Sequence, residues 1–158
     1  VPFDDNSFEL VVSLNVLEHL KSPVKAIDEM IRCSSKAILI RTLISDQTFI
    51  VKEVKNSSHA HQGYDHLNLP LVEKELDDSG DPIVYIYQNV YSEGYINGIL
   101  ENRSNVVSWK IFEDTLWDTN NFDKDNKLNP LDRHTKIIDG KQVRGLFIDT
   151  NTWIVIEK

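Results

Sequence analysis

A cluster of polar residues directly follows the first long apolar run of the chain. Phe8–Val16 (FELVVSLNV) has the near-continuous Val, Leu and Phe content of a strand covered on both faces of a parallel sheet. Glu18 and His19 lie just beyond it, at the carboxyl edge where open α/β sheets bind ligands. A neutral imidazole there can take a proton from a hydroxyl or an amine, so His19 is the candidate base, with Glu18 beside it. The alternative for both is structural: a residue at a helix start that hydrogen-bonds nearby backbone.

A second polar cluster lies in the segment HAHQGYDH, which contains His59, His61, Asp65 and His66. A His-x-His pair with a nearby carboxylate could suit zinc or iron. The chain has one cysteine and no helical H-E-x-x-H, however, so we predict no metal centre. We interpret this segment as a polar loop at the mouth of an active site, with His66 near the substrate. A plain solvated loop is the alternative.

The elements that must position these residues follow one another closely. Ser22 is the expected N-cap of a helix, with Pro23 at its first position. The apolar residues Val24, Ile27, Met30 and Ile31 then recur at spacings of three and four, which places them on one helix face. Ala37–Ile44 (AILIRTLI) is a second apolar strand. Strand, helix and strand make a βαβ unit, which predicts parallel strands joined by a right-handed crossover.

Weaker patterns predict the rest of the chain. The expected elements are a helix at 46–54, a loop at 56–68, a short helix at 69–79 ended by Gly80, an extended piece at 83–87, a helix from Ser92 to Leu100, a strand at 106–117, a loop at 120–130 and a strand at 153–157. The last two strands are expected to form an antiparallel pair at a sheet edge. Tyr91, just before the capped helix, is a candidate for the rim of an acceptor pocket. The alternative is that it belongs to the core, as most aromatic side chains do.

Composition limits the possible partners. The 158 residues carry a formal net charge of −8 and are 41% hydrophobic, which suits one globular domain. The excess of acidic residues argues against binding to nucleic-acid phosphates and to anionic membrane surfaces. No run of 18 apolar residues, as a membrane-spanning helix would need, occurs in the sequence. A small-molecule substrate remains open. Cys33 is the single cysteine and has no intramolecular partner, so we expect it to be buried and the protein to be cytoplasmic.

The segment PFDDNSFELVVSLNVLEHL, followed by the capped helix and the second apolar strand, resembles the class I S-adenosylmethionine-dependent methyltransferases. It is most similar to the small-molecule branch, with the pattern l-P-F-x-d-x-s-F-D-x-V-x-s-x-x-v-l-e-H. Glu9 stands where that family usually has Asp. The resemblance implies an α/β, Rossmann-like methyltransferase fold, truncated to its fourth to seventh strands with flanking helices. Phe8–Val16 and Ala37–Ile44 would be the fourth and fifth strands, and the two expected strands at 106–117 and 153–157 would be the last two.

The resemblance also implies S-adenosylmethionine as cofactor. The backbone of three residues would line its methionine part: Ser13, Leu14 and Asn15. Pro2 and Phe3 would lie near the adenine, and His19 and Glu18 would face the cofactor or the substrate. Some methyltransferases with an E-x-x-E-H box at this strand end hold a divalent metal. Asn15 replaces the first Glu of that box here, which weakens such a site.

The Gly-rich turn and the two acidic residues that hold the cofactor in this family would lie upstream of Val1. The six glycines of the chain form no G-x-G-x-x-G, so residues 1–158 resemble the C-terminal part of a single methyltransferase domain. Without the upstream strands, Phe8–Val16 would present an unpaired apolar edge, which is a template for pairing with another chain. We therefore expect a homodimer or a complementing segment at this edge.

These observations predict part of an S-adenosylmethionine-dependent methyltransferase that acts on an oxygen, nitrogen or carbon atom of a small-molecule acceptor. The chain is expected to be inactive in isolation. Two alternatives remain open. One is a non-catalytic interaction module that retains half of the methyltransferase fold, and the other is a metal-binding hydrolase built on the His-rich loop.

Overall fold

The computed structural model describes residues 2–54, 76–83, 85–114, 135–138, 141–144, 147–150 and 152–158. Its elements follow the chain in this order: β1 (Phe8–Leu14), η1 (Leu17–His19), α1 (Val24–Cys33), β2 (Ser34–Thr42), β3 (Ile44–Ser45), β4 (Lys52–Val54), β5 (Tyr85–Tyr87), β6 (Tyr91–Ser92), α2 (Glu93–Leu100), β7 (Ser108–Glu113), β8 (Thr135–Ile138), β9 (Lys141–Arg144), β10 (Phe147–Asp149) and β11 (Thr152–Glu157).

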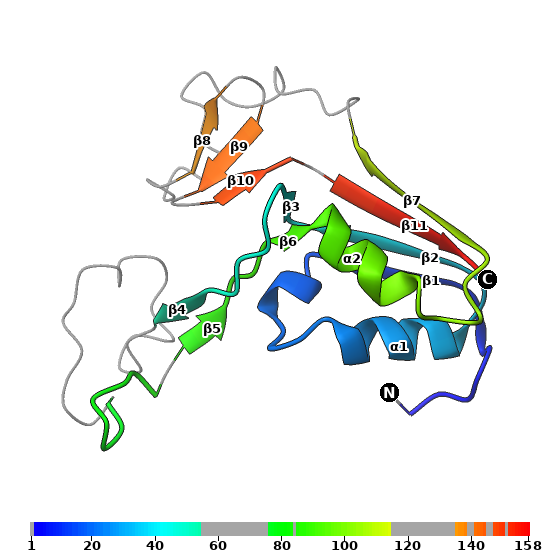
Figure 1. The fold of residues 1–158 in the computed structure, drawn as a ribbon, viewed down its shortest axis with the longest axis horizontal. Helices are drawn as coiled ribbons and strands as arrows, with labels where there is room; N and C mark the ends of the chain where they lie inside the picture. The colour runs from blue at the N-terminus through cyan, green and yellow to red at the C-terminus, as the bar shows by residue number, and fades with distance from the viewer. Residues whose placement is uncertain are drawn as a thin grey trace.

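A mixed sheet of four strands, in the order β1-β2-β11-β7, forms the centre of the molecule (Figure 1). β1 and β2 run parallel and are joined through α1, which confirms the predicted βαβ unit. β11 runs antiparallel to both β2 and β7. The expected antiparallel pair of final strands is therefore confirmed, with β7 at the outer edge.

The core lies on one face of this sheet. Ile38 and Ile40 of β2 are fully buried, and they stand opposite Ile156 and Ile154 of β11 in the register. Because side chains alternate across a strand, these four share one face. The apolar faces of α1 and α2 complete the same buried cluster, which places both helices on the same side of the sheet (Figure 1).

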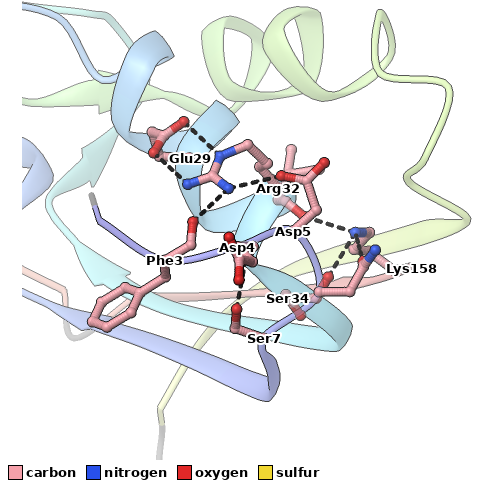
Figure 2. A network of polar contacts seen from close by, with 10 residues as sticks. Phe3, Asp4, Asp5, Ser7, Glu29, Arg32, Ser34 and Lys158 are labelled. Carbon is pink, nitrogen blue, oxygen red and sulfur yellow. Dashed lines mark hydrogen bonds and ion pairs between the residues drawn. The ribbon is translucent and has the colours of Figure 1, made fainter.

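α1 buries the face that its spacing predicts, with Ile27 and Ile31 in the core and Val24 and Met30 packed against it. β2 begins at the residue that follows the helix, so no loop separates the two elements. The ammonium of Lys158 donates to the carbonyls of Ile31 and Ser34 at 2.7 and 2.6 Å (Figure 2). A cation is favourable at the carboxyl end of a helix, so Lys158 stabilises the end of α1.

The turn that precedes β1 is tied to the same end of α1 (Figure 2). Asn6 adopts a left-handed φ of 58°, and its amide donates to the Arg32 carbonyl at 2.9 Å. The Arg32 guanidinium bonds the Phe3 carbonyl and the Asp5 carboxylate, and it also pairs with Glu29. The hydrogen bond from Arg32 is the main cause that lowers the pKa of Glu29 to about 2. The polar run before β1 is thus an ordered turn.

The predicted helix at 46–54 is wrong. Phe49 forms a bridge with Val90, and β4 pairs antiparallel with β5. The run Thr48–Val51 is rich in β-branched and aromatic residues, which suit extended backbone, and pairing with the chain near residue 90 supplies its hydrogen bonds.

The short helix predicted at 69–79 falls partly outside the described residues, and the described part is not helical. Asp77 accepts hydrogen bonds from the amides of Ser79 and Asp81 at 2.9 Å, which forms a turn closed by Gly80 at φ 84°. The small antiparallel sheet β10-β9-β8 was not expected from the sequence. The loops at 56–68 and 120–130 lie outside the described residues.

Several local predictions are confirmed. α2 runs from Glu93 to Leu100, and the Ser92 hydroxyl accepts from the Tyr95 amide at 3.2 Å. Cys33 is buried. Of the residues that the structure describes, none belongs to a helix long and apolar enough to cross a membrane.

Candidate functional site

The carboxyl edge of β1 is shaped by a residue in an unusual backbone conformation. Asn15 follows β1 directly with a φ of 55°, in the left-handed region that Asn tolerates better than most residues. Its amide donates to the Arg41 carbonyl of β2 at 2.9 Å, and its side-chain oxygen accepts from the Arg41 guanidinium. Arg41 also pairs with Asp149 of β10 at 2.8 Å. Hydrogen bonds to Arg41 therefore fix both the backbone and the side chain of Asn15.

The turn η1 that follows is anchored by a buried hydrogen-bond network. The Tyr91 hydroxyl donates to the Leu17 carbonyl at 2.7 Å. The Asn89 amide donates to the Glu18 carbonyl at 2.8 Å, and the Asn89 side chain donates to the Leu20 carbonyl at 2.7 Å. Leu17, Asn89 and Tyr91 are all fully buried. The segment around β6 thus fixes the turn that presents His19.

His19 projects from this turn with its two ring nitrogens in different environments. Nδ1 lies 3.0 Å from the Tyr87 carbonyl oxygen of β5. A carbonyl can only accept, so Nδ1 carries a proton, and Nε2 is the acceptor nitrogen of the neutral imidazole. The His19 residue is solvent-exposed. The structural alternative for His19 requires a hydrogen bond to backbone, and the bond to the Tyr87 carbonyl meets that requirement. The same bond also orients the second ring nitrogen, Nε2, for contact with a reactant.

Glu18 lies on the opposite side of the same turn. It is only 3% exposed, and its carboxylate accepts from the Thr42 hydroxyl at 3.0 Å. Burial is the main cause that raises the pKa of Glu18 above its usual value of 4.5, against smaller lowering effects of its hydrogen bonds and of His19 and Arg41. A buried, hydrogen-bonded carboxyl of this kind is suited to holding η1 against β2. This agrees with the structural role that the sequence left open for Glu18.

The other predicted site residues are not all brought together. Phe3 packs edge-on against Phe8 at the amino end of β1, with ring centroids 5.0 Å apart, and Pro2 precedes it. Asn15 is at the carboxyl end of the same strand, so the structure separates Pro2 and Phe3 from Asn15 by the length of β1. Ser13 is buried, and the adjoining Leu14 is 52% exposed.

Two substrate predictions have different outcomes. The structure places Tyr91 in the core and not at a pocket rim, because its ring is fully buried and its hydroxyl is bonded to Leu17 and Asn89. Burial also raises the pKa of Tyr91, which keeps it a neutral donor. His66 lies outside the described residues, as do His59, His61 and Asp65. No three metal-ligating side chains gather within the described ranges.

A hollow of about 820 Å³ opens at the same edge of the sheet, beside β3 and the start of α2. Its charged lining residues are Asp46, Glu93, Glu113 and Lys141. None of the predicted site residues that the structure describes lines it. This hollow is wide enough for a small molecule, since ligand pockets commonly measure 300–1,000 Å³.

Sequence reasoning missed Arg41, Asp149 and Asn89. Arg41 was detectable in principle, because it is the one charged residue in the apolar run AILIRTLI. Asp149 lies 108 residues further along the chain, and Asn89 lies in a weakly patterned segment, so neither carried a local signal.

Part of the chain matches a known protein family. The family model described as "Methyltransferase domain" matches residues 1–37, which include β1, η1 and α1. This match supports a class I S-adenosylmethionine-dependent methyltransferase, a family whose members generally bind S-adenosylmethionine. The mixed α/β architecture is compatible with a Rossmann-like domain.

A wider stretch of the chain is similar to an uncharacterized protein of Methanocaldococcus jannaschii. The two are 34% identical over 114 residues, which are 72% of this chain and 46% of that protein. The chain thus spans less than half the length of this curated relative. No solved structure matches.

Proposed function

We propose that this chain forms part of an S-adenosylmethionine-dependent methyltransferase that acts on a small-molecule acceptor. One observation carries the proposal. The segment that matches the methyltransferase family contains both the left-handed Asn15 and the exposed His19, and both lie at the carboxyl edge of β1. Ligands bind at this edge in open α/β sheets.

The residues at this edge fit the methionine end of the cofactor. Leu14 offers exposed apolar surface, and Asn15 offers uncharged polar groups. The Arg41 guanidinium pairs with the Asp149 carboxylate, so its charge is compensated where a cationic sulfonium would lie. When bound, the cofactor supplies a methyl group on a positively charged sulfur, which is the electrophile of the reaction.

His19 would act on the acceptor. Its Nε2 takes a proton from a hydroxyl or amine as that group becomes nucleophilic, while Nδ1–H stays bonded to the Tyr87 carbonyl. Because η1 is anchored by buried bonds to Tyr91 and Asn89, the imidazole needs little reorganisation. Glu18 is assigned a positioning role, since its carboxyl is buried against Thr42.

The thermal midpoint of the purified chain, with and without S-adenosylhomocysteine, tests this proposal. At about 100 times its dissociation constant a ligand stabilises the folded state by ~2.7 kcal/mol. That is a rise of roughly 5–10 °C in the midpoint for a domain of this size. Adenosine at the same concentration is the control, because it lacks the part that the Ser13–Asn15 edge would contact. An unchanged midpoint at about 2 mM S-adenosylhomocysteine, where even a millimolar affinity would register, shows that this part of the domain does not hold the cofactor by itself. A midpoint that also stays unchanged when the segment that the family places before β1 is present contradicts the proposal.

A further inference from the structure

The hollow beside β3 and the start of α2 is built from segments that lie far apart in the sequence (Figure 1). β3, β6 and α2 form one side of it, and β7, β9, β10 and β11 supply the rest. The Thr150 and Thr152 hydroxyls bond each other at 2.6 Å where β10 leads into β11. The Lys141 ammonium of β9 pairs with the Glu113 carboxylate of β7 at 3.7 Å. All described lining residues come from Ile44 onwards, so neither β1 nor α1 contributes to the hollow.

Large apolar side chains line this hollow from three separate segments. Phe49, Phe112 and Ile148 are 51%, 38% and 52% exposed, although each lies in or next to a strand. The buried side chains of Ile44 and Val90 also belong to the lining. The apolar body of a ligand in the hollow would cover side chains that the fold leaves in contact with water, which is favourable.

The hydroxyl groups of the lining already have partners within the protein. The Ser92 hydroxyl accepts from the Tyr95 amide and bonds the Thr48 hydroxyl at 3.0 Å. The Ser45 hydroxyl donates to the Gln47 carbonyl at 2.7 Å, and the two lining threonines bond each other. The charged side chains are therefore the groups that decide which ligand the hollow prefers.

Carboxylates outnumber ammonium groups in the lining. Glu113 is paired with Lys141, so these two charges offset each other. Asp46 and Glu93 form neither an ion pair nor a side-chain hydrogen bond within the part of the chain that the structure describes. Glu93 lies in the first turn of α2, where its negative charge offsets the positive end of the helix dipole and disfavours an anion. Because no three metal-ligating side chains gather within the described ranges, a metal ion is also disfavoured.

We propose that this hollow binds a small organic cation, an amine that is protonated at neutral pH and carries an apolar body. The body would lie against Phe49, Phe112 and Ile148. The ammonium group would lie near Asp46 and Glu93, since a cleft with an excess of one charge concentrates ligands of the opposite charge. The proposal does not depend on methyl transfer, because the residues assigned to the cofactor and the acceptor do not line the hollow.

Three probes with the same alkyl chain length test the charge preference: n-hexylammonium, n-hexanol and hexanoate. Binding is followed by the amide chemical shifts of the ¹⁵N-labelled chain at neutral pH and low salt. We expect saturable shifts at lining residues such as Ser45, Gly94 and Thr152. The dissociation constant of n-hexylammonium should be about threefold lower than that of n-hexanol or less, and hexanoate should bind most weakly. Salt at about 0.5 M should weaken the binding of n-hexylammonium and leave that of n-hexanol unchanged.

Neutral variants of the two unpaired carboxylates test where the ammonium group lies. Asp46→Asn and Glu93→Gln each remove one charge with little change of shape. Each should raise the dissociation constant of n-hexylammonium about two- to fivefold and leave that of n-hexanol unchanged. Glu101→Gln at the other end of α2 is the matched control, and it should change neither constant, because Glu101 does not line the hollow.

A space-filling variant tests the apolar part of the site. A Cβ at Gly94 would meet no atom within 4 Å, and helical side chains lean towards the amino end of the helix, which borders the hollow. Gly94→Leu should therefore weaken the binding of n-hexylammonium and of n-hexanol alike. Gly98→Leu is the matched control: Gly98 has equally open space on the same helix but does not line the hollow. Far-ultraviolet circular dichroism reports whether each variant is folded.

Three results would overturn the proposal. The first is hexanoate or n-hexanol binding as tightly as n-hexylammonium. The second is shifts that gather outside the lining of the hollow, or that Gly94→Leu leaves unchanged. The third is the absence of saturable shifts up to about 20 mM n-hexylammonium, where the affinity expected of so small a ligand would register.

Discussion

Tyr91→Phe removes one hydroxyl from the network that anchors η1, and it should destabilise the fold measurably. The hydroxyl donates to the Leu17 carbonyl at 2.7 Å and accepts from the Asn89 side chain at 3.1 Å, and all three residues are fully buried. Water cannot replace these bonds in a packed core. Leaving a buried polar group unsatisfied costs ~1–3 kcal/mol. We therefore expect the free energy of unfolding to fall by ~2 kcal/mol, which lowers the thermal midpoint by roughly 4–8 °C in a chain of this length.

Urea denaturation followed by circular dichroism gives this difference directly, provided that the slope with denaturant is unchanged. Tyr95→Phe is the matched control. Its ring stacks on that of Tyr91 at 5.8 Å, but Tyr95 is exposed, so the same deletion should change stability by less than about 0.5 kcal/mol. Equal stabilities for Tyr91→Phe and the wild type would refute the anchoring role.

Three further predictions concern single residues. The raised pKa of Glu18 means that the folded state binds more protons than the unfolded state above about pH 4.5, so stability falls as the pH rises towards the folded-state pKa. Glu18→Gln lacks this titration, so its thermal midpoint should gain on that of the wild type as the pH rises above about 4.5; a difference that stays constant with pH would contradict the burial effect. Asn15→Ala should lower the free energy of unfolding by ~1–2 kcal/mol, as measured in urea, because alanine tolerates the left-handed backbone of this position poorly. Asn15→Gly should lower it by clearly less, because glycine adopts this conformation readily. Lys158→Met should cost ~1–2 kcal/mol in the same assay, because it leaves the carbonyls at the end of α1 without their cation; a neutral effect would exclude that cap.

The sequence predicted the parts of the fold whose signals are local. The run Phe8–Val16, the spacing of Ile27 and Ile31, and the Ser92 cap each specify an element through its own residues. The antiparallel pair of β7 and β11 also followed, because both strands alternate and are connected by a long excursion. These are the elements on which the core is built.

The elements that failed depend on distant partners. The extended backbone at Thr48–Val51 is stabilised by pairing with the segment near Val90, about forty residues later, which no local pattern reveals. The same dependence on distant partners explains which residues of the candidate site the sequence could not predict. His19 was found because it follows a recognisable strand, whereas the residues that fix it, Asn89 and Tyr91, come from β6 and its approach.

The carboxyl end of β1 carries Asn15 and leads into the turn with His19, where the proposed cofactor and acceptor meet.

The measurement that tests the central claim most directly is a titration of the ¹⁵N-labelled chain with S-adenosylhomocysteine, followed by amide chemical shifts. This readout detects even millimolar binding and assigns it to residues. The account predicts saturable shifts concentrated at Ser13, Leu14, Asn15 and His19, with Phe3 and Lys110 unaffected. Saturable shifts that concentrate away from the carboxyl edge of β1 would contradict it.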